Sequence, residues 1–386
     1  MKLLPILLAF LLWCLPVWPV AAQVAMPLHT GLIEGRAAIL DAHGARVRLK
    51  AVNWYGAESA ALVVGGLDRQ PLAAIAKLIK SRGFNAVRLP WCNEMVERNP
   101  VVSDARVAAN PHLKGQHVLA VYDAVVKALT AQGLMVVLDN HRSRGDWCCD
   151  AAHGDGLWYT SLYPEQAWLA DWQSMAGRYR ANPLVIAAEL RNEIRSDATL
   201  GTTPNWGSGD RATDWRLAAQ RGAEAVLKAN PNLLIIVGTP DYQTDLSPVR
   251  DHPLVLTVPH RLVYAAHDYA WDRSAGELAD PLAFEVGSWQ RWDFVREGGH
   301  PYTAPVFISE WGGCLQGVCA PDRAAFVRAF MQYQRASRID WAYWPLNGVQ
   351  MTGYGRTNGA LEGYGLLKPD WSGWADPALV AQLTGQ

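Results

Sequence analysis

Two glutamates stand out because each one closes an apolar run of the chain. Glu193 ends the run that begins at Val185, and Glu310 ends the run that begins at Val306. A facing pair of carboxyl groups can break a glycosidic bond, because one protonates the departing sugar oxygen while the other attacks the anomeric carbon. A separation of about 5 Å between them gives retention of configuration. We therefore expect a retaining glycosidase with Glu193 as general acid/base and Glu310 as nucleophile.

Two residues that end other apolar runs could keep these carboxylates in different protonation states. Arg88 is always cationic and would lower the pKa of Glu310 while holding it by hydrogen bonds. Tyr269 could donate a further hydrogen bond to Glu310. The negative charge on Glu310 would in turn raise the pKa of Glu193, so that one carboxyl is ionised and the other protonated near neutral pH.

Other residues at the ends of these runs could bind the sugar. Asn192 is placed to bind a hydroxyl beside the reacting carbon, where hydrogen bonding strengthens in the transition state. His141 and His267 could bind further hydroxyls or tune the carboxylates, although a single strand-end histidine is as often structural. For stacking against a sugar ring we expect Trp344 and, in loops, the outlying candidates Trp54, Trp147, Trp158 and Trp271.

The elements that must position these residues follow a βα rhythm. Eight apolar, β-branched runs predict strands at 47–55, 86–91, 135–141, 185–193, 233–240, 263–269, 306–311 and 341–348. Helical periodicity predicts helices at 72–82, 117–132, 165–180, 214–229 and 322–336. Eight strands with intervening helices favour an α/β fold of the (β/α)8 TIM-barrel type, in which the carboxyl ends of all strands meet on one face.

An open doubly wound sheet fits the sequence less well. A nucleotide-binding fold would need a Gly-rich phosphate turn after the first strand, and Asn53-Trp54-Tyr55-Gly56 is not one. A serine hydrolase is also disfavoured, since no Gly-x-Ser-x-Gly elbow follows a strand.

Composition narrows the class of ligand. The chain has 386 residues, a net charge of -1 and 18 tryptophans. Because the Lys and Arg residues are scattered, nothing offers the basic surface that nucleic-acid binding requires. A neutral chain rich in Trp is consistent with a sugar ligand and equally with a Trp-rich core. We expect an oligo- or polysaccharide substrate and a monomeric protein.

The amino-terminal residues resemble a secretory signal. The apolar run after Met1-Lys2 ends at the small residues Val20-Ala21-Ala22, which predicts a signal peptide over 1–22 and a secreted or periplasmic protein without further membrane contact. An uncleaved anchor is the alternative, since about 18 apolar residues can span a bilayer. No linker-like stretch divides the remainder, which predicts one catalytic domain over 31–386.

Five cysteines follow the expected signal peptide. Cys314 and Cys319 are close enough in sequence to form a disulfide within one loop. Cys92 could pair with Cys148 or Cys149, so that one cysteine stays unpaired. A metal site made by Cys148, Cys149, Asp150 and His153 is an alternative interpretation, but its spacing matches no standard zinc pattern, so we predict no metal.

These motifs, taken in order, resemble glycoside hydrolase family 5, the cellulase family, along nearly the whole mature chain. The matching segments are Ala86-Val87-Arg88-Leu89-Pro90, Leu138-Asp139-Asn140-His141, Leu190-Arg191-Asn192-Glu193, His267-Asp268-Tyr269, Ile308-Ser309-Glu310-Trp311-Gly312 and 341–344. The stretch from Leu138 through 154–159 to Asn182-Pro183 looks like bacterial endo-β-1,4-glucanases of that family.

The resemblance implies a (β/α)8 fold, retaining hydrolysis, no obligatory cofactor and the two glutamate roles given above. It also implies an active-site set of Arg88, His141, Asn192, His267, Tyr269 and Trp344. Two positions depart from the family pattern: Ile194 stands where proline usually follows the acid/base, and Trp311 where phenylalanine usually follows the nucleophile. Neither change removes a reacting group.

Fold and chemistry do not fix the substrate. A β-1,4-glucan is the leading expectation, with mannan, xyloglucan, mixed-linkage glucan or a glucosyl lipid as alternatives. Transglycosylation by the same two glutamates, and a barrel that only binds carbohydrate, are the competing functions. The intact set of Glu193, Glu310, Arg88 and Tyr269 argues against the second.

Overall fold

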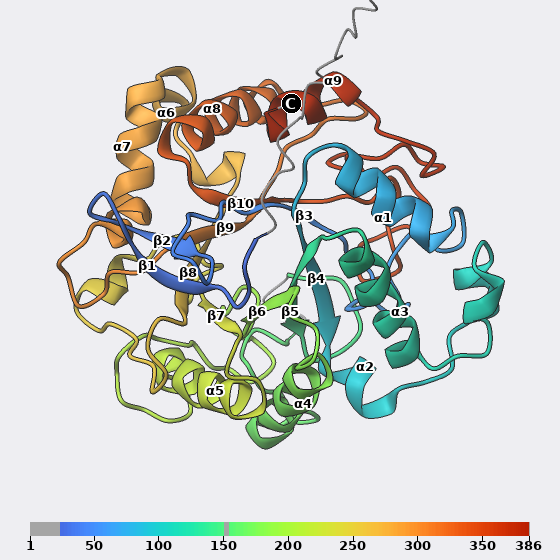
Figure 1. Cartoon of the computed structure of the whole chain (residues 1–386), viewed down its shortest axis with the longest axis horizontal. Helices are drawn as coiled ribbons and strands as arrows, with labels where there is room; N and C mark the ends of the chain where they lie inside the picture. The colour runs from blue at the N-terminus through green and yellow to red at the C-terminus, as the bar shows by residue number, and fades with distance from the viewer. Residues whose placement is uncertain (1–23, 150–153, 386) are drawn as a thin grey trace, which may run out of the picture.

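Eight parallel strands close into a barrel, and helices surround it (Figure 1). The computed structural model describes residues 24–149 and 154–385, so the expected signal peptide lies outside the described residues. Around the barrel the strands follow the order β10-β3-β4-β5-β6-β7-β8-β9, each parallel to its neighbours. The predicted TIM barrel is therefore confirmed.

Each barrel strand falls inside or close to one of the eight predicted runs. These runs are apolar because strands of a barrel covered by helices are buried on both faces. The strands are β3 (Lys50–Asn53), β4 (Ala86–Cys92), β5 (Met135–Arg142), β6 (Val185–Glu189), β7 (Leu234–Val237), β8 (Leu262–Asp268), β9 (Val306–Trp311) and β10 (Asp340–Tyr343).

The five predicted helices are also present, with ends that differ by at most two residues. They are α1 (Leu72–Ser81), α3 (Val118–Ala131), α4 (Glu165–Arg178), α5 (Trp215–Ala229) and α8 (Pro321–Ser337). Four further helices had not been predicted: α2 (Asn93–Arg98), α6 (Ala275–Ala279), α7 (Pro281–Arg291) and α9 (Pro377–Thr384). Short 3₁₀ turns cover Asp104–Val107, Pro111–Leu113, Ser247–Arg250, Ala270–Asp272 and Asp293–Arg296.

A two-stranded hairpin, also not predicted, covers the amino-terminal end of the barrel. It consists of β1 (His29–Ile33) and β2 (Arg36–Leu40), which pair antiparallel. Leu28 and Ile39 pack against side chains of the barrel interior, and the Thr30 N–H donates to the carbonyl of His260 at 3.0 Å. The barrel is therefore closed at this end, and its opposite end is the one free for a site.

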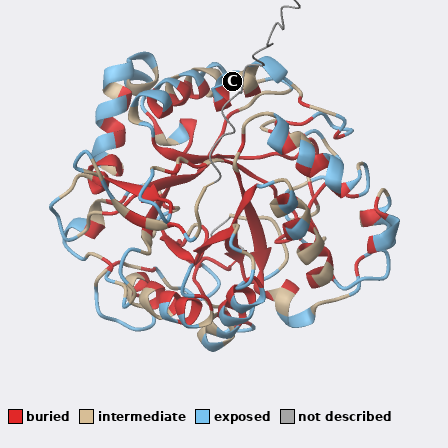
Figure 2. Cartoon of the chain, in the orientation of Figure 1, coloured by how far each residue is buried: buried red, intermediate tan, exposed pale blue. Residues whose placement is uncertain are grey.

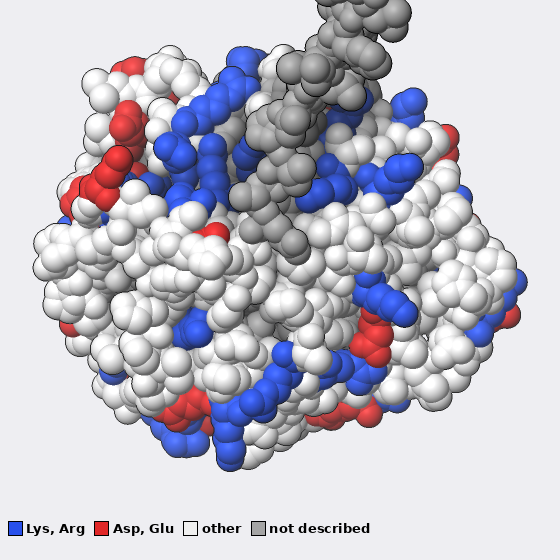
Figure 3. All heavy atoms as spheres, in the orientation of Figure 1, with Lys and Arg blue, Asp and Glu red and all other residues white. Residues whose placement is uncertain are grey.

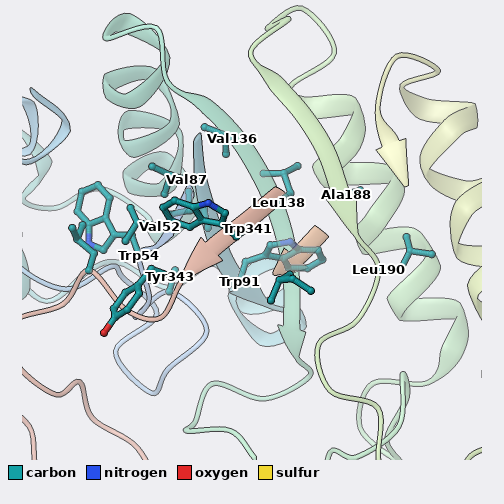
Figure 4. Close-up of a cluster of buried hydrophobic side chains, with 14 of the residues drawn as sticks. Val52, Trp54, Val87, Trp91, Val136, Leu138, Ala188, Leu190, Trp341 and Tyr343 are labelled. Atoms are coloured by element: carbon teal, nitrogen blue, oxygen red, sulfur yellow. The ribbon is translucent and has the colours of Figure 1, made fainter. Parts of the chain in front are cut away.

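Most of the tryptophans belong to the core, which lies between the barrel and its helices and inside the barrel (Figure 2). Figure 4 shows Trp54, Trp91 and Trp341 packed among apolar strand residues. The fully buried tryptophans are Trp54, Trp91, Trp158, Trp168, Trp172, Trp215, Trp292, Trp311, Trp341 and Trp371. The high Trp content is thus mainly a property of packing.

The surface is mixed in charge. In the view of Figure 3, Lys and Arg side chains form several separate groups, with Asp and Glu nearby and wide areas that carry neither. Within residues 24–149 and 154–385, no helix is long and apolar enough to cross a bilayer.

Candidate active site

A cavity of about 670 Å³ opens at the carboxyl ends of the barrel strands. In a (β/α)8 barrel this is the face where side chains from distant parts of the sequence converge. The predicted residues that line the cavity are His141, Asn192, Glu193, His267, Tyr269, Glu310, Trp344, Trp147 and Trp271.

Glu193 and Glu310 face each other across this cavity. One carboxylate oxygen of each lies within 4.8 Å of the other and of a ring nitrogen of His267. Glu310 projects from β9, and Glu193 lies in the segment just after β6. This separation matches the roughly 5 Å of carboxyl pairs that act with retention, and it is shorter than the roughly 6.5–9.5 Å of pairs that act with inversion.

Two donors hold the carboxylate of Glu310. Arg88 Nη1 donates to Oε1 at 2.7 Å, and the Tyr269 hydroxyl donates to Oε2 at 3.0 Å. Burial, reinforced by the negative charge of Glu310, raises the pKa of Tyr269 well above its ordinary value, so the phenol keeps its proton. Both oxygens of Glu310 thus accept a hydrogen bond, which fixes the orientation of the carboxylate.

Arg88 is completely buried and reaches the active-site carboxylates from below the cavity, without lining it. Its Nε donates to Glu189 Oε2 at 2.6 Å, and its Nη2 lies 3.2 Å from Asp139 Oδ2. Nη2 also donates to Asn192 Oδ1 at 2.8 Å. Arg88 therefore orients other side chains, Glu310 among them as expected, and has no exposed atom to offer a sugar.

A chain of hydrogen-bonding groups continues from Glu193 into the barrel. His267 Nδ1 lies 2.8 Å from Glu193 Oε1, and His267 Nε2 lies 3.1 Å from the Ser309 hydroxyl. That hydroxyl donates to Glu189 Oε1 at 2.9 Å. Because the Ser309 proton points to Glu189, the Ser309 oxygen accepts from His267, and His267 must carry a proton on Nε2.

Asn192 and His141 are held in a similar way. Since Asn192 Oδ1 accepts from Arg88, its amide nitrogen faces His141 Nε2 at 3.3 Å. His141 Nδ1 lies 2.6 Å from Asp139 Oδ2. Burial lowers the pKa of His141 to about 3 and raises that of Asp139 to about 8, so the imidazole is neutral near pH 7. The Asn192 amide can still donate into the cavity.

Comparison with known proteins agrees with this geometry. Residues 40–350 match the sequence profile of Cellulase (glycosyl hydrolase family 5). The chain belongs to glycosyl hydrolase family 5. An endoglucanase of Paenibacillus polymyxa is 32% identical over 377 residues, which cover 94% of this chain and 87% of that protein. The major extracellular endoglucanase of Xanthomonas campestris pv. campestris is 31% identical, over 91% of this chain and 70% of its own length.

Solved structures of the same family share the fold. The endocellulase of Pyrococcus horikoshii superposes with a TM-score of 0.77 and 26% identity, over 94% of this chain and 100% of that one. A complex of that endocellulase with cellotetraose gives a TM-score of 0.76 over the same shares of the two chains. This chain is therefore a glycosyl hydrolase built on the family 5 barrel.

The predicted direction of one pKa is wrong in this family 5 site. We expected the charge of Glu310 to raise the pKa of Glu193. Burial does raise that pKa, but the hydrogen bond and positive charge of His267 outweigh burial, and the pKa of Glu193 is lowered. Burial lowers the pKa of His267, whereas Glu310 and Glu193 raise it more. Both shifts favour a protonated imidazole beside an ionised carboxylate across the 2.8 Å contact.

The stacking candidates divide into two groups. Trp344 lines the cavity, with its indole nearly parallel to the rings of Tyr55 and His141 at centroid distances of 5.3 and 5.5 Å. Trp271 is 59% exposed at the rim and lies on Tyr269 at 4.5 Å. Trp54 is a correction, because its indole is fully buried in the core and its Nε1 donates to the Gly65 carbonyl.

Trp158 is likewise buried, and its Nε1 donates to Glu165 at 2.9 Å. Trp147, by contrast, lines the cavity beside Trp344, with the guanidinium of Arg356 4.0 Å above its ring. These corrections arise because an aromatic residue in a loop shows no periodicity that would say which way it points.

Three functional residues were missed by the sequence interpretation: Asp139, Glu189 and Ser309. A signal did exist for two of them. Asp139 precedes His141 by two residues on β5, and side chains two apart on a strand share a face. Glu189 is a charged residue inside an otherwise apolar buried strand, which requires a buried partner.

The cysteines differ from the expected pairing. Cys314 and Cys319 lie close enough for the expected disulfide, with Cα atoms 5.5 Å apart, whereas the sulfur of Cys148 lies against that of its neighbour Cys149. Cys92 is a buried free thiol whose pKa is raised by burial. Cys148 and Cys149 line the cavity, with sulfurs 3.6 and 3.7 Å from the Asn192 amide nitrogen. The other groups of the alternative metal interpretation, Asp150 and His153, lie outside the described residues.

Proposed function

We propose that this chain is a retaining endo-β-1,4-glucanase in which Glu310 is the nucleophile and Glu193 the general acid/base. The observation that carries the proposal is the approach of the two carboxylates to within 4.8 Å at the open end of the barrel. At that distance one carboxylate can bond to the anomeric carbon while the other reaches the glycosidic oxygen.

The reaction then takes two balanced steps. Glu310 attacks the anomeric carbon, and the bond from that carbon to the leaving oxygen breaks. Glu193 receives a proton from His267 Nδ1 across their 2.8 Å contact and delivers it to that oxygen. A glycosyl ester on Glu310 results. In the second step Glu193 removes a proton from water, the water oxygen bonds to the anomeric carbon, and Glu310 leaves as a carboxylate. The configuration inverts twice and is therefore retained.

The surroundings of the two glutamates support this division of roles. Glu310 accepts hydrogen bonds from Arg88 and Tyr269, so its orientation is fixed for attack. Glu193 shares a proton with His267 across 2.8 Å. When Glu310 forms the ester its charge disappears, and the attraction that holds the proton on His267 weakens. The pair thus supplies one proton in the first step and recovers one in the second.

The substrate class follows from the relatives and fits the cavity. The relatives in Paenibacillus polymyxa and Xanthomonas campestris are named endoglucanases, and the Pyrococcus horikoshii endocellulase has been solved with cellotetraose. Indole faces of Trp344 and Trp271 at the cavity suit the apolar faces of β-1,4-linked glucose. Secretion after removal of 1–22, a single domain over 31–386 and a monomeric state are further parts of the proposal. The apolar start of the sequence and the extracellular relative support secretion, and the one closed barrel supports a single domain.

Product analysis of the mature protein tests the function. Carboxymethylcellulose, mixed-linkage glucan, glucomannan, xyloglucan and xylan should be incubated with the enzyme and with Glu310→Gln. We expect β-1,4-glucans to yield β-configured oligosaccharides, and the variant to yield none. Products longer than the substrate would indicate transglycosylation. Binding without cleavage of any substrate would contradict the enzymatic proposal.

A further inference from the structure

The backbone at Glu193 has a conformation that its residue type rarely adopts. Its φ of 45° lies in the left-handed region, which costs L-residues free energy and persists only where neighbouring groups hold it. Glu193 lies just after β6, and this conformation sets the direction in which its side chain points toward His267. Some contact must therefore stabilise the peptide group before Glu193.

Gln243 makes that contact from the loop after β7. Its carboxamide oxygen accepts from the Glu193 N–H at 2.6 Å, and its Nε2 donates to Glu189 Oε1 at 3.3 Å. Its own carbonyl accepts from the His267 N–H at 3.0 Å. The Gln243 side chain is buried, with 1% of the residue exposed. Gln243 is thus hydrogen-bonded to Glu193, to its partner His267 and to Glu189. Glu189 is the last member of the hydrogen-bonded chain described above.

The loop that carries Gln243 is itself unusual. Asp241, Tyr242 and Gln243 have φ values of 65°, 60° and 62°, three left-handed residues in succession and none of them glycine. Tyr242 N–H donates to the carbonyl of Ile194 at 3.2 Å, directly beyond Glu193. The left-handed turn 241–243 therefore lies against the left-handed residue Glu193, and backbone and side-chain hydrogen bonds join the two segments.

Space for the Gln243 side chain is provided by Gly238. A Cβ at position 238 would lie 2.3 Å from Gln243 Cγ and 2.5 Å from its Nε2. Any larger residue there would push the carboxamide away from Glu193. The glycine and the glutamine thus form a matched pair, which gives two independent ways of removing the same contact.

We propose that Gln243 is a positioning residue for proton transfer by Glu193. Its carboxamide holds the left-handed backbone from which the Glu193 carboxyl reaches both His267 and the leaving oxygen. This inference rests on the proposed acid/base role of Glu193. It adds a residue outside the set that the sequence pointed to, and it involves no contact between Gln243 and the substrate.

The leaving group of the substrate provides the test. A 2,4-dinitrophenolate departs without protonation, whereas the sugar hydroxyl released from cellopentaose needs an acid. We would measure kcat/KM, which reports the first bond cleavage, for 2,4-dinitrophenyl β-cellobioside and for cellopentaose. The wild type, Gln243→Met, Gly238→Ala and Glu193→Gln would be compared, with thermal unfolding recorded for each.

We expect Gln243→Met and Gly238→Ala to lose about tenfold or more on cellopentaose and less than about threefold on the dinitrophenyl substrate, since general acid catalysis contributes about 10²- to 10⁴-fold. Thr239→Val is the matched control, because Thr239 bonds to the Asp245 carbonyl in the same loop and does not line the cavity. It should lower the unfolding temperature without changing the ratio of the two rates.

Equal losses on both substrates, or no loss, in Gln243→Met and Gly238→Ala would overturn the inference. Glu193→Gln separates this outcome from a failure of the proposed function. If Glu193→Gln shows the selective loss and the other two do not, only the role of Gln243 is rejected. If Glu193→Gln loses both substrates equally, its acid/base role fails and the inference fails with it.

Discussion

The Nδ1 atom of His267 lies 2.8 Å from Oε1 of Glu193 and ties the charge state of the imidazole to that of the carboxyl. Removal of the proton from either group changes the proton affinity of the other, so the pair titrates as a unit. The histidine is thus tied to the proposed acid/base, and its ionisation should be visible in the stability of the fold as well as in the rate.

Protonated His267 should stabilise the folded protein at moderately low pH. Burial lowers its pKa, but Glu310 and Glu193 outweigh burial and the net pKa is raised. The folded state therefore holds this proton more tightly than the unfolded chain does. The resulting stabilisation is complete below the ordinary pKa of about 6.5 and is lost as pH rises through the folded-state value.

Denaturant unfolding of the wild type and His267→Asn between about pH 5.5 and pH 9 would check this sign. The difference in free energy of unfolding should shrink as pH rises. A difference that stays constant or grows with pH would mean that His267 is not protonated in the fold.

Ser309 should set which ring nitrogen of His267 keeps its proton once the imidazole becomes neutral at high pH. Its hydroxyl donates to Glu189 and accepts from His267 Nε2, so Ser309→Ala would leave that N–H without an acceptor. We expect kcat to fall about tenfold or more, since a hydrogen bond to a charged group is worth about 1.5–3 kcal/mol. Nitrogen NMR of labelled histidine, recorded above the folded-state pKa of His267, should show a changed tautomer population, and Ser309→Thr should restore it. An unchanged His267 spectrum in the alanine variant would exclude this role.

Tyr269→Phe should slow the chemistry with little effect on substrate affinity. The variant loses the 3.0 Å hydrogen bond to Glu310 Oε2 and keeps the ring that packs on Trp271. A hydrogen bond to a charged group is worth about 1.5–3 kcal/mol, which corresponds to about 10- to 150-fold in kcat. Steady-state kinetics on cello-oligosaccharides would show a fall in kcat at nearly constant KM. A change confined to KM would instead assign Tyr269 to sugar binding.

Trp271→Ala should weaken substrate binding, whereas Tyr269→Phe slows the chemistry. The indole is 59% exposed at the cavity rim, and an aromatic face there can pack on a sugar ring distant from the reacting carbon. We expect KM for cellopentaose to rise about 5- to 30-fold, as for the loss of about 1–2 kcal/mol of stacking, with thermal stability almost unchanged. Equal KM values for Trp271→Ala and wild type on long substrates would remove Trp271 from the binding surface.

The pairing of the cysteines can be counted chemically. Thiol titration of the mature protein should find no reactive thiol in the native state, because Cys92 is buried and its pKa is raised. One thiol should appear on unfolding, and Cys92→Ala should abolish it. Since Cys148–Cys149 and Cys314–Cys319 occupy the other four cysteines, a count of three thiols would show that one pair is reduced.

The parts of the fold that could be predicted are those with a strong local pattern. Buried parallel strands are continuous apolar runs, and the change to polar residues at their carboxyl ends marks the catalytic face, which is how Glu193 and Glu310 were found. The β1–β2 hairpin was missed because its two five-residue strands show little alternation.

What could not be predicted depends on three-dimensional contacts. Gln243 lies in a turn of three left-handed residues. None of the three is a glycine, so their residue types do not indicate the left-handed conformation. Trp54 lies directly after β3, and its side chain turns into the core. Residue type alone cannot distinguish a core position from one that faces the cavity. The pKa of Glu193 depends on which neighbour is closer, and His267 is hydrogen-bonded to it whereas Glu310 is not.

The buried position of Arg88 has a further consequence for protein engineering. Its guanidinium lies among Glu189, Asp139 and Glu310, and these three carboxyl groups together exceed its single positive charge. Replacement of such a cluster by well-packed apolar side chains often makes a protein more stable. In this enzyme selection for heat tolerance alone should therefore favour substitutions at the centre of the barrel that abolish turnover, and directed evolution would have to screen for activity in every round.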